Sequence, residues 1–150
     1  MIRKTTDLLP ELYEADETAW LDEMAEMTEQ GRYNELDYAH LGEFLADMAR
    51  RDRREVESRL EVLLTHVLKW THQPHKRTPS RRGTILTQAH ELARLLESGA
   101  LRNHAESVLG KVYLESVAVA SAETELIAAM FPKECPCTVE QLLAAEVLDS

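Results

Sequence analysis

Glycine and proline are scarce in this sequence, with five of each in 150 residues. The turns between short strands draw on both residue types, so their scarcity argues against many short strands and favours a few long elements. A chain of this length buries about 70% of the surface that its unfolded form exposes. It therefore needs neither disulfides nor a metal ion to fold, and we expect a single domain over residues 1–150.

Long apolar runs and cysteine pairs are missing too. No run of 18 apolar residues occurs, so the sequence predicts no membrane span. Polar residues follow Met1-Ile2-Arg3-Lys4 and predict no signal peptide. The two cysteines, Cys135 and Cys137, lie two residues apart, where a mutual disulfide would be strained. Two thiols without a framework of pairs favour a reducing, cytoplasmic location.

Charge is spread unevenly along the chain, whose net charge is −10. Residues 1–49 hold 3 basic and 13 acidic groups, residues 50–82 hold 10 and 4, and residues 83–150 hold 4 and 10. A basic middle segment in an acidic chain is suited to binding the chain's own acidic parts, a partner chain or a polyanion.

Apolar residues at spacings of three and four predict amphipathic helices. After a loosely ordered segment over residues 1–14, we expect helices over about 16–30, 37–71, 80–97, 101–121 and 138–147. The second would be about 50 Å long at 1.5 Å per residue, with a weak point at the polar residues 50–54. Gly110 costs the fourth helix about 1 kcal/mol relative to alanine and marks a candidate point of close helix–helix approach. The fold class predicted is all-α, an antiparallel bundle of four to five helices with one long central helix.

Several stretches resemble a known family. They are residues 13–20, residues 31–37, the run from Leu63 to Trp70 with Pro74 after it, and the ending from Phe131 to Pro136. Over nearly its whole length the chain resembles a family of uncharacterised bacterial proteins, abundant in cyanobacteria and proteobacteria and classified as the twenty-ninth domain of unknown function. Arg81 stands where that family usually has tryptophan, and Gly83 where alanine is common. The resemblance implies an all-α fold and no particular activity.

Three histidines, His66, His72 and His75, lie close enough in sequence to be weighed as zinc ligands. Pro74 interrupts the second pair, and no acidic ligand stands beside them at helical spacing. Cys135 and Cys137 are distant in sequence, and they could complete a mixed metal site only if the fold brought them next to the histidines. We therefore predict no metal site and no cofactor, and keep the three histidines as weak candidates.

The strongest chemical anomaly is the set of basic residues in the middle segment, because arginine binds phosphates and carboxylates through two hydrogen bonds. The candidates for binding an anion or a partner are Arg50, Arg51, Arg54, Lys76, Arg77, Arg81 and Arg82. The simpler interpretation of these basic residues is that they neutralise the chain's own acidic helices. Residues 76–82 form the better anion site, because a helix begins there and its N-terminus is partially positive.

No catalytic pattern stands out: the sequence has no glycine-rich phosphate loop, nucleophile elbow or His-Glu-x-x-His motif. We predict a non-enzymatic helical interaction protein that binds a protein partner or forms a homo-oligomer. The alternative is a nucleic-acid-associated regulator or antitoxin-like protein that uses the basic segment 50–82. Overall acidity counts against the alternative, because a negatively charged chain repels phosphates.

Overall fold

The structure is a computed structural model, and it describes residues 8–150. Within that range the chain is all-α, with six α-helices and no strand, which confirms the predicted fold class. Contacts between residues group the chain into two compact units, Met1–Arg50 and Arg51–Ser150. The single domain expected from chain length stays a prediction, and the two units are described separately below.

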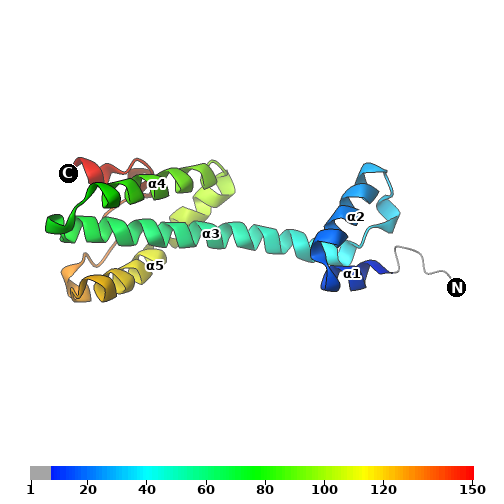
Figure 1. Cartoon of the computed structure of the whole chain (residues 1–150), viewed down its shortest axis with the longest axis horizontal. Coiled ribbons are helices and arrows are strands. Elements are labelled where there is room, and N and C mark those ends of the chain that lie inside the picture. The colour runs from blue at the N-terminus through cyan, green and yellow to red at the C-terminus, as the bar shows by residue number, and fades with distance from the viewer. Residues whose placement is uncertain (1–7) are drawn as a thin grey trace. The chain divides into compact units, whose positions relative to one another are not determined.

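The N-terminal unit contains α1 (Leu9–Ala15), α2 (Glu17–Glu29), a short 3₁₀ turn (Tyr33–Glu35) and the start of α3 (Tyr38–His72). Asp16 caps α2 by accepting a hydrogen bond from the backbone N–H of Ala19 at 3.1 Å. A small core is formed by Leu9, Trp20, Met24 and Met27. These residues come from α1 and α2, which pack against each other (Figure 1).

The expectation of a loosely ordered segment is wrong for residues 9–14, which belong to α1; residues 1–7 lie outside the described range. Pro10 stands in the first turn of α1, where its fixed φ suits a helix and its missing N–H costs nothing. Leu9 is buried in the same core as Trp20. Burial against α2 therefore stabilises a helix of only seven residues, which would not form alone in water.

The long helix α3 confirms the predicted central element, since its bounds lie one residue from those expected at each end. No proline interrupts it, and apolar side chains from Val56 to Trp70 recur at helical spacing on its buried face. Residues 48–55 are all exposed, so no burial supports the helix there. The two compact units divide within this exposed stretch, at the polar residues where the sequence predicts a weak point.

The C-terminal unit is an antiparallel bundle. The second half of α3, α4 (Pro79–Leu95) and α5 (Gly99–Thr124) run alternately up and down, and α6 (Val139–Leu143) packs near α4 (Figure 1). Short 3₁₀ turns connect or follow these helices at Pro74–Lys76, Ala128–Met130 and Glu146–Asp149. The buried core draws on all four helices, including Leu60, Leu64, Ile85, Leu92, Val112, Tyr113 and Leu142.

Side-chain caps fix where these helices begin. Thr78 accepts from the N–H of Arg81 at 3.1 Å, and Ser98 accepts from the N–H of Leu101 at 3.3 Å. Thr138 and Gln141 form a capping box at the start of α6. No helix within residues 8–150 is both long and apolar enough to cross a membrane.

Candidate functional site

The basic candidates do not form one surface. Arg50, Arg51 and Arg54 lie on α3, whereas Lys76, Arg77, Arg81 and Arg82 lie beyond its C-terminal end or in the first turn of α4. Within the C-terminal unit, about 27 Å of helix separates Arg54 from the end of α3, at roughly 1.5 Å per residue. The basic segment therefore divides into two groups.

The first basic group is partly neutralised by its own helix. Arg50 forms an ion pair with Asp47, three residues before it. Further along α3, Arg59 pairs with Glu55 at 3.1 Å. Arg54 is exposed between these pairs. The pairing of Arg50 with a carboxylate three residues away follows the ordinary pattern of helix ion pairs.

In the second basic group, which consists of Lys76, Arg77, Arg81 and Arg82, two of the arginines contact backbone oxygens and one of these two also contacts an aromatic ring. Arg77 donates from Nε to the backbone oxygen of Trp70 at 2.9 Å, and its guanidinium lies 5.0 Å from the centre of the Trp70 ring. Arg82 donates to the backbone oxygen of Leu148 at 3.3 Å. Within residues 8–150, none of the cations Lys76, Arg77, Arg81 and Arg82 forms an ion pair with a carboxylate.

His66 borders a cavity of about 200 Å³ between α3 and α5. Burial lowers the pKa of its imidazole, and the positive charge of Lys69 lowers it further. Lys69 itself forms an ion pair with Glu123 at 3.0 Å across the same cavity. His66 is therefore a neutral side chain at neutral pH, beside a neutralised ion pair.

The other two histidine candidates, His72 and His75, have surroundings different from those of His66. The ring of His72 packs edge-on against Phe131, with ring centres 4.8 Å apart. His75 is exposed in the turn that follows α3. In the part of the chain that the structure describes, no three His, Cys, Asp or Glu side chains gather in a way that could hold a metal ion.

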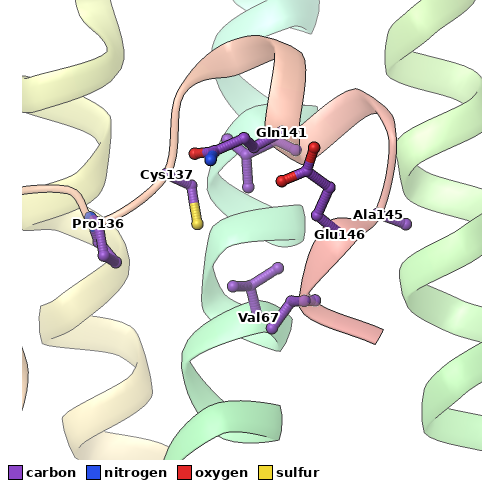
Figure 2. A pocket seen from close by; sticks show the side chains of 8 residues that line it. Val67, Pro136, Cys137, Gln141, Ala145 and Glu146 are labelled. Carbon is purple, nitrogen blue, oxygen red and sulfur yellow. The ribbon is translucent and has the colours of Figure 1, made fainter. Parts of the chain in front are cut away.

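Both cysteines are free thiols in the segment before α6. Cys137 lines a mostly apolar pocket of about 200 Å³ together with Val67 and Pro136 (Figure 2). Leu142 lines the same pocket. The thiol of Cys135 donates to the backbone oxygen of Cys137 at 3.2 Å. Burial raises the pKa of both thiols, so the thiolate that a nucleophile or metal ligand requires is disfavoured.

The N-terminal unit holds a polar group that the sequence reasoning missed. Oδ2 of Asp37 lies 2.7 Å from Nδ1 of His40 and accepts from Nε1 of Trp20 at 3.2 Å. The His40 ring stacks on Tyr13, with ring centres 4.3 Å apart. Two signals pointed to this group: a buried tryptophan N–H needs an acceptor, and Asp37 stands three residues before His40.

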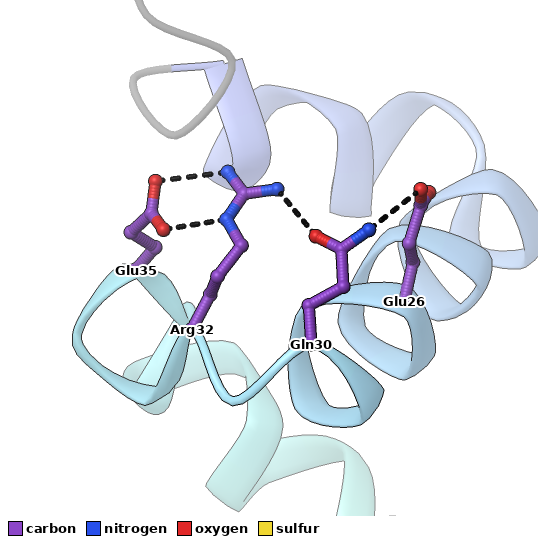
Figure 3. A network of polar contacts seen from close by, with 4 residues as sticks. All are labelled: Glu26, Gln30, Arg32 and Glu35. Carbon is purple, nitrogen blue, oxygen red and sulfur yellow. Dashed lines mark hydrogen bonds and ion pairs between the residues drawn. The ribbon is translucent and has the colours of Figure 1, made fainter.

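A second polar network fixes the turn after α2. Arg32 donates two hydrogen bonds to Glu35, at 2.6 and 2.9 Å, and a third to Gln30 at 3.1 Å (Figure 3). Gln30 in turn donates to Glu26 at 3.2 Å. Each of the three nitrogens of the Arg32 guanidinium thus donates to a neighbour close in sequence, and these bonds hold the turn.

A groove of about 470 Å³ lies beside α5 in the C-terminal unit. Its lining consists of Glu106, Leu109, Gly110, Tyr113 and Leu114 from α5, with Lys133, Glu134 and Cys135 from the segment before α6. Tyr113 is buried and donates to the backbone oxygen of Pro132 at 2.5 Å, which ties that segment to α5. Leu114, in contrast, is 61% exposed.

Leu114 also escaped the sequence reasoning, because it lies off the apolar stripe that packs α5 into the bundle. That stripe includes Ala105, Val112 and Val117, all of which are buried. A leucine outside the core-facing stripe was the available signal, but a single exposed leucine is common on protein surfaces. Leu114 becomes a candidate binding residue only because it lines the groove.

A protein-family model described as domain of unknown function DUF29 matches residues 12–148, so the chain belongs to that family. The resemblance drawn from the sequence is thereby confirmed. No curated protein and no solved structure matches the chain.

Proposed function

We propose that this member of the DUF29 family is a non-enzymatic helical interaction protein whose C-terminal unit binds a protein at the groove beside α5. The observation that carries the proposal is Leu114, a large apolar side chain that is 61% exposed and lines a 470 Å³ groove. Leu109 and Tyr113 add apolar groups to its lining, and Lys133 and Glu134 add charged groups. An apolar centre with a polar rim is the usual composition of a protein-binding surface.

A non-enzymatic function is supported by the state of the reactive groups. Burial disfavours the thiolate of Cys135 and Cys137, and a thiol that stays protonated is a poor nucleophile. Two free cysteines fit a reducing environment, so a bacterial cytoplasm is the location that we propose.

A photo-crosslinking amino acid at position 118 tests the proposed surface. Ala118 is exposed on α5, one helical turn after Leu114. We expect covalent adducts to a protein in the native host, lost when Leu114→Lys is introduced. The control carries the same amino acid at position 90, which is exposed on α4. Equal adducts at both positions, or adducts unaffected by Leu114→Lys, would contradict the proposal.

Binding of nucleic acid through residues 76–82 is the second candidate function, favoured by four cations that have no carboxylate partner in the described chain. It predicts an affinity for DNA or RNA that falls steeply with salt. The double substitution Arg77→Ala and Arg81→Ala should flatten that slope. The matched control, Arg94→Ala with Arg102→Ala, removes two cations that do have carboxylate partners. Binding that is absent or independent of salt would remove this candidate.

A further inference from the structure

The exposed face of α5 carries opposite charges on either side of an apolar residue. Lys111, Leu114 and Glu115 are spaced by three and four residues and so lie on one face of the helix. The Lys111 side chain is 69% exposed and that of Glu115 is 48% exposed. Within the chain, Lys111 reaches Glu115 only at 4.0 Å and Glu57 at 3.9 Å. Its ammonium is therefore not held in a close ion pair.

Gly110 lies one turn before Leu114 on α5 and lines the groove. Glycine weakens the interior of a helix, so a packing reason for it is expected. No atom of a neighbouring element lies within 4 Å of the position that a Cβ would occupy. The chain's own fold gives no packing reason for glycine here, whereas a helix from another molecule approaching at this point would.

We propose that α5 pairs in antiparallel orientation with α5 of a second copy of this chain, about a two-fold axis near position 113. This inference rests on the proposed function and names the partner. In such a pair, Lys111 of each copy lies opposite Glu115 of the other, so both charge pairs are made at once. Leu114 of the second copy lies at the height of position 112, between Gly110 and Leu114 of the first.

The self-complementary charges favour a second copy over an unrelated helix. A two-fold axis repeats every contact, so one favourable pair of residues on a single helix gives two favourable pairs in the dimer. Gly110 and Ala118 are the small exposed residues on either side of Leu114. Small side chains let two helix axes approach to about 8 Å, the close end of helix packing.

Sedimentation of the full-length protein tests the pairing. We expect a mass of twice 17.1 kDa at micromolar concentration and low salt. Lys111→Glu and Glu115→Lys should each weaken association by about tenfold or more, because like charges then oppose each other twice. The double substitution restores two opposite pairs in reversed order and should return association close to that of the unmodified protein. Exchange of Glu91 and Arg94, an exposed ion pair on α4, is the matched control and should change nothing.

Gly110→Ala provides a separate readout, since it adds one methyl group at the point of closest approach. It should weaken association without lowering the thermal stability of the monomeric Lys111→Glu protein, because the chain leaves open space around that position. A monomer at all concentrations, or a dimer insensitive to these substitutions, would overturn the inference. If the monomer still gives adducts at position 118 that Leu114→Lys abolishes, the proposed function stands and only the second copy as partner is wrong.

Discussion

Asp37 and His40 are joined in the N-terminal unit by a contact of 2.7 Å between a carboxylate oxygen and the ring nitrogen Nδ1. The same oxygen accepts from the indole N–H of Trp20, and the side chain of Asp37 is only 7% exposed. Tyr13 of α1 stacks on the imidazole. One carboxylate thus connects α2 with the start of α3, and through the imidazole it supports α1.

Asp37→Ala should therefore destabilise the N-terminal unit by about 1–3 kcal/mol, because it leaves the buried Trp20 N–H without an acceptor. Urea unfolding followed by tryptophan fluorescence and circular dichroism measures the change. Asp22→Ala, which removes an exposed carboxylate from α2, is the control and should stay within about 0.5 kcal/mol of the unmodified protein. An Asp37→Ala protein as stable as this control would show that the contact contributes nothing.

The stability of the C-terminal unit should depend on pH because of His66. Burial, aided by Lys69 and Arg81 and opposed by Glu123, lowers its pKa in the folded state below the ordinary value of 6.5. Between those two pKa values the unfolded chain binds more protons than the folded one, so stability falls as the pH drops below about 6.5. His66→Gln should remove this part of the dependence. Unfolding between pH 7.5 and 5 checks it, and an NMR titration that places the His66 pKa above 6.5 would contradict it.

Gly110 and Gly31 should respond oppositely to alanine. Gly110→Ala meets open space in a helix interior and should stabilise the monomer by about 0.5–1 kcal/mol. Gly31 ends α2 with φ at +72°, in the left-handed region, so Gly31→Ala should destabilise by about 1 kcal/mol. Thermal unfolding of dilute protein in high salt compares the two. Loss of stability in Gly110→Ala under those conditions would mean that the chain itself needs the glycine.

The sequence predicted most of the helices because their signals are local. Asp16, Thr78 and Thr138 are capping residues followed by apolar residues at helical spacing, and each caps a helix in the structure. The helix α1 was missed because it is short and depends on the burial of Leu9 against α2. Such burial is a property of two elements together, which periodicity in one segment does not show.

The candidate site was harder to predict for the same reason. The basic residues were visible in the sequence, but the partners that distinguish Arg50 from Arg77 come from different places. Arg50 pairs with a carboxylate one helical turn away, whereas Arg77 stacks on the ring of Trp70 after the chain has reversed direction. The groove beside α5 forms only when the segment after Phe131 returns to Tyr113. The spacing of residues along the sequence does not predict this contact between the segment after Phe131 and α5.

The two cysteines should react slowly with alkylating reagents while the protein is folded. Burial raises the pKa of each thiol, and the thiolate is the reactive form. At pH 7.5 we expect alkylation of both to be slower than that of a free cysteine, because a smaller fraction of each thiol is present as thiolate and each side chain is only partly exposed. In urea both should react at the rate of the free amino acid. Mass spectrometry of the Cys135→Ser and Cys137→Ser proteins assigns each rate, and rapid labelling of either thiol in the folded protein would show that the segment before α6 opens readily.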